Sequence, residues 1–228
     1  MGRWADNARV LFELDSVTMS RGGREVLRGL TATLPEGASC VAGPSGCGKS
    51  SLLRLLNRLA DPDAGTVAYR GRDVRERDVL ELRREVCLVP QLPALLDGTV
   101  ADNVRYAAEL AGREPDVERL LDLAGLDSSY GERDSSRLSV GEQQRAMLAR
   151  GLALEPDVLL LDEPTSALDD EARGAVEATL FDLRERVDVS IVLVTHDLEQ
   201  ARRMSDWVVR LERGRAVQQG PARELLPA

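Results

Sequence analysis

The sequence predicts an α/β fold in which helices cover a parallel β-sheet, with a small antiparallel β-lobe and a helical lobe beside it. The first observation is a set of four short apolar runs, SCVAG, EVCLVPQ, DVLLLDE and SIVLVTHD. Runs that are apolar on both faces are typical of central strands in a parallel sheet. The second observation is that helical patterns separate these runs, and strands that alternate with helices form βαβ units.

Two segments show the apolar spacing of a helix that packs on a sheet. In SLLRLLNRLA and EARGAVEATLFDLRERV, apolar residues recur every three or four positions and therefore share one face. They are Leu52, Leu55, Leu56 and Leu59 in the first segment, and Val176, Leu180, Leu183 and Val187 in the second. We expect both segments to be helices that bury this face.

Two further regions do not fit the parallel core. Residues 10–36 and 65–72 resemble β-hairpins, which predicts the antiparallel lobe, and residues 92–150 are mostly helical in pattern. The sequence shows no internal repeat and no long linker. We therefore expect a single domain over residues 1–228, with a helical subdomain at approximately residues 92–150.

The composition limits the possible functions. The chain has 228 residues, 43% of them hydrophobic, and a formal net charge of −9. This acidic balance argues against a nucleic-acid partner, and the arginines of YRGRDVRERDVLELRRE alternate with acids as on a solvated surface. No apolar run approaches the ~18 residues of a membrane span, and the start of the chain does not resemble a signal peptide. We expect a cytoplasmic protein whose three cysteines, Cys40, Cys47 and Cys87, are reduced.

A glycine-rich segment, GPSGCGKSS, follows the first apolar run and precedes a predicted helix. Its spacing matches G-x-x-x-x-G-K-[ST], in which backbone N–H groups, a helix N-terminus and a lysine surround nucleotide phosphates. Lys49 is the only lysine in the chain, and we expect Ser50 to bind Mg²⁺ as well. The residues predicted to hold the phosphates are Gly43, Pro44, Ser45, Gly46, Cys47, Gly48, Lys49, Ser50 and Ser51.

Polar side chains stand at the ends of the other three apolar runs, where ligands of doubly wound sheets bind. We expect Asp162 to orient Mg²⁺, Glu163 to act as general base on water, and Gln91 to reach both the metal ion and the water. His196, the only histidine, is predicted to hold the terminal phosphate and the water. The alternatives are a solvated strand end for the carboxylates and a structural role for the histidine.

The order of the motifs resembles that of the ATP-binding-cassette (ABC) ATPases over essentially the whole chain. The motifs are GPSGCGKS, Gln91, the signature LSVGE, LLLDEP, SALD and THD. The resemblance implies a P-loop NTPase with a RecA-like parallel sheet, ATP and Mg²⁺ as ligands, and a head-to-tail homodimer. Ser139 and Gly141 would contact ATP held by the partner chain, and Ser166 and Asp169 would connect the two sites. The alternative interpretation of LSVGE is an ordinary helix N-cap with Glu142 in the first turn.

The sequence departs from the family pattern at three positions. Arg21 stands where the family usually has an aromatic residue that stacks on adenine, and a guanidinium plane can stack on a base as well. The alternative is an exposed arginine, with adenine held weakly. The signature carries Val140 where glycine is commonest and Glu142 where glutamine often occurs. Neither change removes the serine hydroxyl or the Gly141 amide.

The resemblance implies an ATPase subunit that powers a permease on a separate chain and lies at the inner face of the membrane. QLPALLDGTVADNVRYAAELAG is the expected docking surface, and its resemblance to two-component iron and metal exporters suggests a metal ion or another small solute as cargo. The alternative is a soluble ABC ATPase in translation or DNA repair. Translation types usually carry two cassettes, and repair types insert a long coiled coil between the positions of Gln91 and Leu138, where this sequence has no sustained heptads.

Overall fold

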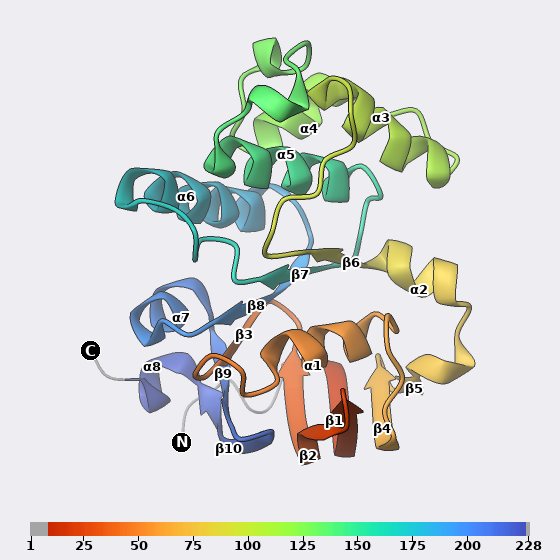
Figure 1. Ribbon diagram of the computed structural model, residues 1–228, viewed down its shortest axis with the longest axis vertical. Helices are drawn as coiled ribbons and strands as arrows, with labels where there is room; N and C mark the ends of the chain where they lie inside the picture. Colours follow the sequence, from red (N-terminus) through yellow and green to blue (C-terminus); the bar gives the residue numbers. More distant parts are fainter. Residues whose placement is uncertain (1–8, 227–228) are drawn as a thin grey trace. The chain divides into compact units, whose positions relative to one another are not determined.

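The computed structural model describes residues 9–226, which form two compact units (Figure 1). The first unit combines the chain up to Val86 with the chain from Ser190 onward, and the second unit runs from Cys87 to Val189. The first unit therefore holds the glycine-rich loop and His196, whereas the second unit holds Gln91, the carboxylate pair and the signature.

An antiparallel sheet in the first unit confirms the predicted hairpins. Its strands, in the spatial order β2-β1-β4-β5, are β1 (Val10–Arg21), β2 (Arg24–Pro35), β4 (Ala64–Tyr69) and β5 (Arg72–Asp73). Gly22 and Gly23 both have positive φ angles and form the tight turn between β1 and β2, as expected for a two-residue hairpin loop. The rings of Phe12 and Tyr69 lie 5.1 Å apart in the buried face of this sheet.

The first unit also contains the strands of a second, mixed sheet. They lie in the order β10-β9-β3-β8, with bounds β3 (Ala38–Ala42), β8 (Ser190–Thr195), β9 (Trp207–Glu212) and β10 (Arg215–Pro221). Strand β3 is buried along its whole length and pairs in parallel with β8 and β9. Because parallel strands end at one edge of a sheet, the loops that follow β3 and β8 are neighbours. The helices of this unit are α1 (Lys49–Leu56), α2 (Val79–Glu85), α7 (Leu198–Met204) and α8 (Ala222–Leu225), with a 3₁₀ turn at Val74–Glu76.

Helix α1 is shorter than the apolar spacing predicted. It ends at Leu56, its C-cap is Asn57, and Arg58 has a positive φ of 55°. Leu52, Leu55 and Leu56 are buried, but Leu59 lies beyond the turn and is 49% exposed. The prediction was therefore wrong for Leu59, because the Asn57–Arg58 turn ends the helical periodicity before that residue is reached.

The second unit contains two neighbouring strands and the predicted helices. The strands are β6 (Val86–Val89) and β7 (Val158–Asp162), and the helices are α3 (Val100–Leu110), α4 (Val117–Leu123), α5 (Val140–Leu152) and α6 (Asp170–Arg186), with 3₁₀ turns at Ser128–Tyr130 and Ser135–Arg137. Helix α5 packs against α3, α4 and α6 (Figure 1). Val176, Leu180 and Leu183 are buried as predicted, whereas Val187 is the half-buried C-cap of α6.

A buried asparagine fixes the loop that follows β6. Asn103, 1% exposed, accepts a hydrogen bond from Leu96 N and donates to the carbonyls of Leu96 and Thr99. The Ser135 hydroxyl donates to the same Leu96 carbonyl at 2.9 Å. Because buried amides need partners on both sides, this network holds residues 92–99 against α3 and against the segment that precedes the signature.

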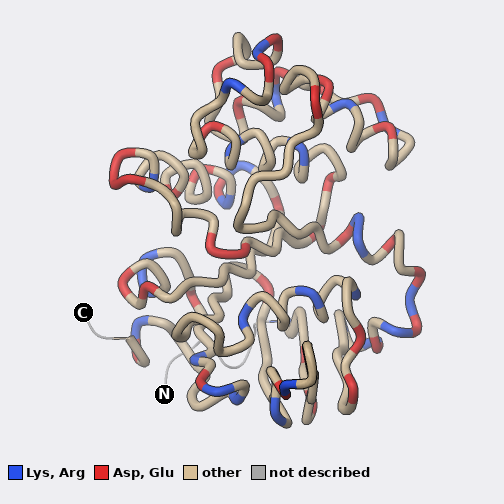
Figure 2. Tube along the Cα trace, viewed as in Figure 1, with Lys and Arg blue, Asp and Glu red and all other residues tan. Residues whose placement is uncertain are grey.

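The arginine-rich stretch around β5 and α2 is a solvated surface with interspersed charges of both signs (Figure 2). Arg75 pairs with Asp73 at 2.6 Å, Arg77 with Glu85 at 2.7 Å, and Arg72 with Glu76 at 3.8 Å. Across residues 9–226, none of the helices has the length and apolar content needed to cross a membrane.

Candidate functional site

The glycine-rich loop lies between β3 and α1 and is hydrogen-bonded to the end of β8. Gly43 N donates to the Thr195 carbonyl at 3.2 Å, and this contact extends the pairing of Ala42 with Thr195. The Lys49 ammonium group curls back over the loop and donates to the carbonyls of Gly43 at 2.8 Å and Pro44 at 3.1 Å. Lys49 is only 4% exposed. The loop therefore surrounds a buried positive charge.

The N-terminus of α1 lacks the side-chain cap that the N-termini of α3, α5 and α6 have. Thr99, Ser139 and Asp169 cap α3, α5 and α6 with their side chains. Helix α1 is preceded by Gly48, so within the described residues no side chain caps it, and its first turn has no acidic residue. Its first N–H groups and the helix dipole therefore favour an anion. Together with Lys49, this is the arrangement that a phosphate group requires.

The glycines of the loop differ in how much space a side chain would have at each position. A Cβ atom on Gly43 would lie 2.2 Å from the Leu211 carbonyl oxygen, and one on Gly48, whose φ is 111°, would lie 2.7 Å from Leu27 Cδ2. Gly46 also has a positive φ, of 77°, but a Cβ there would meet no protein atom within 4 Å. Gly43 and Gly48 are therefore required by neighbouring protein atoms, whereas Gly46 faces the open side of the loop.

His196 and Arg21 also belong to the first unit. His196 is exposed and follows Thr195, whose carbonyl accepts the hydrogen bond from Gly43. The structure therefore places His196 at the sheet edge where the loop begins. Arg21 is exposed at the tip of the β1–β2 hairpin, opposite Arg24. The same hairpin approaches the loop through Leu27, which limits the space at Gly48.

In the second unit, Gln91 and Glu163 are brought together through a serine. The Ser166 hydroxyl donates to the Glu163 carbonyl at 3.1 Å and accepts a hydrogen bond from Gln91 Nε2 at 3.0 Å. The amide nitrogen of Gln91 is thus engaged by Ser166. Glu163 has a positive φ of 45°, a strained conformation that is typical of functional sites. Asp162, which ends β7, is 9% exposed.

The predicted metal ligands fit Mg²⁺ by their chemistry. Ser50, Asp162 and Gln91 offer a hydroxyl, a carboxylate and an amide oxygen, and Mg²⁺ prefers such oxygen ligands. Ser50 is half-buried in the first turn of α1. Ser50 belongs to the first unit, and Gln91 and Asp162 belong to the second.

The signature forms a capping box at the start of α5. The Ser139 hydroxyl accepts a hydrogen bond from Glu142 N at 3.4 Å, and Glu142 Oε2 accepts one from Ser139 N at 2.7 Å. Gly141 is buried against α6, where a Cβ would lie 3.2 Å from Ala172 Cβ. The signature is thus an N-cap, as its alternative interpretation states. A capping box engages the Ser139 amide but leaves the Gly141 amide outside its two hydrogen bonds.

Asp169, another predicted site residue, caps α6. Its carboxylate accepts a hydrogen bond from Ala172 N at 2.8 Å, and the residue is exposed. The side chain is therefore fixed at the surface at the start of a helix of 17 residues.

Two residues that the sequence interpretation missed surround Glu142. The Tyr130 hydroxyl donates to Glu142 Oε1 at 2.6 Å, and the Arg133 guanidinium lies 3.7 Å from the centre of the Tyr130 ring and 3.8 Å from Oε1. The Tyr130 hydroxyl, with the Ser139 N–H, lowers the pKa of Glu142 to about 2. Glu142 is therefore a carboxylate at any pH at which the protein would be used. No motif marks Tyr130 or Arg133; the only signal was the glutamate in the signature.

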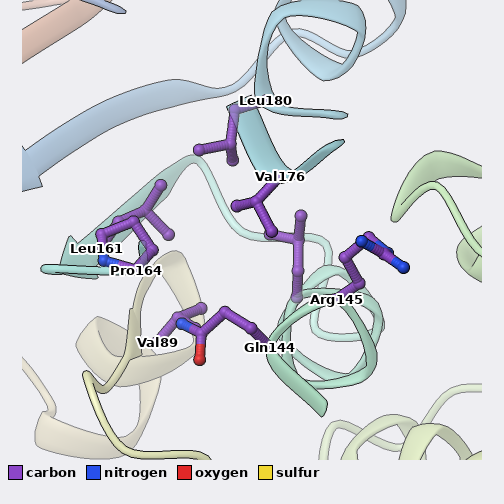
Figure 3. A pocket seen from close by; sticks show the side chains of 8 residues that line it. Val89, Gln144, Arg145, Leu161, Pro164, Val176 and Leu180 are labelled. Atoms are coloured by element: carbon purple, nitrogen blue, oxygen red, sulfur yellow. The ribbon is translucent and has the colours of Figure 1, made fainter. Parts of the chain in front are cut away.

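A small apolar pocket lies beneath α5 (Figure 3). Its volume is about 10 Å³, barely enough for one water molecule. Gln144 points from α5 toward Val89 (Figure 3), and its Nε2 donates to the Pro90 carbonyl at 3.4 Å. This contact links the signature helix to the residue that precedes Gln91.

Comparisons with known proteins agree with this geometry. The sequence pattern of the ABC transporter family matches residues 27–166, more than half of the chain. Protein STAR1 of Oryza sativa subsp. japonica is 47% identical over 210 residues, which are 90% of this chain and 61% of that protein. ABC transporter I family member 17 of Arabidopsis thaliana is 43% identical over 208 residues, 90% of this chain and 79% of that one. The chain thus spans less than two thirds of the length of STAR1.

A solved structure shares the fold. The structure of cbiO1 from Clostridium perfringens, described as part of the ABC transporter complex cbiONQ, superposes with a TM-score of 0.86 at 24% identity. The superposition covers 95% of this chain and 90% of that chain. The predicted α/β fold with its separate antiparallel sheet is confirmed, and together with the family match it is the fold of a P-loop NTPase.

Alanine substitutions should separate the two kinds of loop glycine. Gly43→Ala forces a Cβ against a backbone carbonyl, so we expect the free energy of unfolding to fall by about 3 kcal/mol. Gly46→Ala adds only backbone strain, about 1 kcal/mol, but should weaken ATP binding about tenfold or more, because the methyl group occupies the open side of the loop. Urea denaturation and titration with a fluorescent ATP analogue measure the two effects. Normal ATP affinity in a stable Gly46→Ala chain would contradict this assignment of the open side.

Proposed function

Because the chain belongs to the ABC transporter family, we propose that it is the ATP-hydrolysing subunit of a membrane transporter and powers a permease on a separate chain. The observation that carries the proposal is the uncapped N-terminus of α1 beside the buried ammonium group of Lys49. These groups bind phosphate, and the family match gives ATP as the nucleotide. The name of the Arabidopsis relative, an ABC transporter, favours transport over a role in translation or DNA repair.

In the proposed reaction, ATP lies with its phosphates on the loop 43–51. Lys49 and the first N–H groups of α1 bind the β- and γ-phosphates, and Ser50, Asp162 and Gln91 hold Mg²⁺. When bound there, Mg²⁺ would offset negative charge on the phosphate oxygens. Glu163 accepts a proton from the attacking water, a role worth roughly 10²–10⁴ in rate.

His196 donates a hydrogen bond to the γ-phosphate and orients the same water. Two observations support this assignment. Its strand end is joined to the loop by the hydrogen bond between Gly43 N and the Thr195 carbonyl, and the residue itself is exposed rather than packed into the core.

The second part of the proposal is a head-to-tail homodimer that encloses two ATP molecules. Each chain is one ABC domain over residues 1–228, with a helical subdomain at approximately residues 92–150 that presents the signature. The Ser139 hydroxyl and the Gly141 N–H, at the start of α5, bind the γ-phosphate held by the partner chain. Ser166 and Asp169 link the two sites. Support comes from the exposure of Ser139, Ser166 and Asp169.

The third part of the proposal is a docking surface for the permease. Four large apolar side chains are exposed after Gln91 and along α3: Leu92 (73%), Leu96 (45%), Tyr106 (49%) and Leu110 (59%). Exposed apolar groups close in sequence are typical of protein interfaces. The Asn103 network holds this loop to α3, so a shift of Gln91 on binding ATP and Mg²⁺ moves a connected surface. The chain then lies at the cytoplasmic face of the membrane, and its cargo is a small solute such as a metal ion.

Trapping the dimer tests the central part of the proposal. Glu163→Gln removes the general base but no phosphate contact, so ATP with Mg²⁺ should convert the chain from monomer to dimer in sedimentation experiments. The control Glu118→Gln, at an exposed position of α4, should stay monomeric at the end of turnover. Adding Ser139→Ala to Glu163→Gln should weaken the dimer. A Glu163→Gln chain that stays monomeric in saturating ATP and Mg²⁺ would contradict the proposed ATP-dependent homodimer.

Arg21 is proposed to stack on the adenine ring in place of an aromatic residue. Arg21→Ala should weaken ATP binding about tenfold, which corresponds to an interaction of about 1.4 kcal/mol, whereas Arg21→Tyr should retain it. Arg24, the cross-strand neighbour in the hairpin, provides the matched control. Isothermal titration with ATP gives the affinities. Equal affinities for Arg21→Ala and the unchanged chain would remove this role.

The docking surface is tested with a matched pair of leucines. Leu92→Ser should reduce the amount of membrane protein that is recovered with this chain from detergent-solubilised membranes, because it removes an apolar contact. Leu80→Ser, at a position on α2 that is 59% exposed, should not change it. If both substitutions reduce recovery equally, or neither does, residues 92–110 are not the docking surface.

A further inference from the structure

The signature of this chain contains a charge problem, and the inference drawn from it rests on the proposed function. Helix α5 is proposed to bind the γ-phosphate held by a partner chain, yet Glu142 places a carboxylate in its first turn. Two negative charges at one helix N-terminus repel each other and compete for the same N–H groups. A binding-competent signature therefore needs the Glu142 carboxylate to be held elsewhere.

Both oxygen atoms of this carboxylate are engaged by the chain itself. Oε1 accepts the hydroxyl of Tyr130 at 2.6 Å, and Oε2 accepts the N–H of Ser139 at 2.7 Å. These distances are those of strong hydrogen bonds to a charged acceptor. The side chain of Glu142 is only 22% exposed. The carboxylate is thus turned back toward residues 130–133 and across the N-cap.

Arg133 completes the cluster. Its guanidinium stacks on the Tyr130 ring at 3.7 Å and reaches Glu142 Oε1 at 3.8 Å. The ion pair alone is weak, because the Arg133 side chain is 49% exposed and water screens it. Stacking on the ring fixes the guanidinium beside the carboxylate, and it also holds the ring of the tyrosine that donates to Oε1.

We propose that Tyr130 and Arg133 are positioning residues, which hold the Glu142 carboxylate away from the phosphate-binding groups of α5 and offset its charge. The Ser139 hydroxyl and the Gly141 N–H are then available to ATP held by a partner chain. Neither residue touches ATP; both act through Glu142.

This arrangement makes the role of Tyr130 conditional on the charge at position 142. With Glu142 in place, loss of the tyrosine hydroxyl frees a carboxylate oxygen beside the incoming γ-phosphate. With glutamine at that position, no negative charge is freed. The effects of substitutions at the two positions are therefore expected to be non-additive.

The test compares four chains that all carry Glu163→Gln: the parent, Tyr130→Phe, Glu142→Gln, and the two combined. The measurement is the ATP concentration that gives half-maximal dimer in sedimentation experiments with Mg²⁺. Tyr130→Phe should raise that concentration about tenfold when residue 142 is glutamate and less than about twofold when it is glutamine. Arg133→Gln should raise it about threefold, whereas the control Arg119→Gln, exposed on α4, should not change it.

Two further readouts distinguish positioning from simple packing. High salt should reduce the penalty of Tyr130→Phe, because salt screens charge repulsion and not lost packing. Carbon NMR of the Glu142 carboxyl group should show its titration midpoint move up from about 2 toward the ordinary glutamate value when Tyr130→Phe is introduced.

Three outcomes would overturn the inference. Equal penalties for Tyr130→Phe with glutamate and with glutamine at position 142 would mean that the tyrosine only packs. The absence of a penalty in the presence of Glu142 would mean that the carboxylate needs no support. If the parent chain forms no dimer in ATP and Mg²⁺, the proposed function itself is contradicted. This result is distinguishable from the other two, because it is seen in the parent chain before any substitution at position 130 or 142 is compared.

Discussion

The hydrogen bond from Gly43 N to the Thr195 carbonyl joins the ends of β3 and β8, and the position of the glycine-rich loop depends on it. Strand β3 is buried along its length between two parallel neighbours, so its register is fixed by pairing on both sides. Strand β3 is covered by its neighbours until it ends at the edge of the sheet, and the loop that follows it leads directly into α1. That turn places Lys49 and His196 at one edge. The site is thus a consequence of sheet topology, to which the glycine loop adds the local geometry.

Among the helices of seven or more residues that the structure describes, α1 is the one whose N-terminus has no side-chain cap. Ser139 and Asp169 accept N–H groups of their own helices, as the short polar residues at helix starts usually do. Gly48 has no side chain with which to do so. An uncapped end beside a buried lysine is costly unless an anion binds there. A bound phosphate would remove this cost, which is why the start of α1 is proposed as the phosphate site.

The sequence predicts the elements whose signals are local, and it misses features that depend on distant partners. The strands that end at Thr195 and Asp162 can be predicted from a single sequence, because a strand that is buried on both faces is a continuous run of apolar residues. Leu59 was misplaced because α1 ends at Leu56 and the chain then turns at Arg58, whose positive φ the periodicity does not reveal. The contact of Gln91 with Ser166 spans 75 positions in the sequence, so no window of residues could predict it.

Carboxylates show how position decides what one chemical group does here. Asp169 stands just before α6, and its carboxylate accepts a hydrogen bond from a backbone N–H of that helix. Glu163 stands at a positive φ just after a buried strand, a strained conformation that persists only when surrounding structure holds it. Glu142 stands inside a first turn, where it would oppose an incoming phosphate, and it is the one that the chain surrounds with a tyrosine hydroxyl and a stacked guanidinium. A signature with glutamate therefore has a requirement that a signature with glutamine lacks. The signature motif therefore has to be interpreted together with the side chains that contact it. Glutamine and glutamate at position 142 produce different electrostatic fields at the N-terminus of α5.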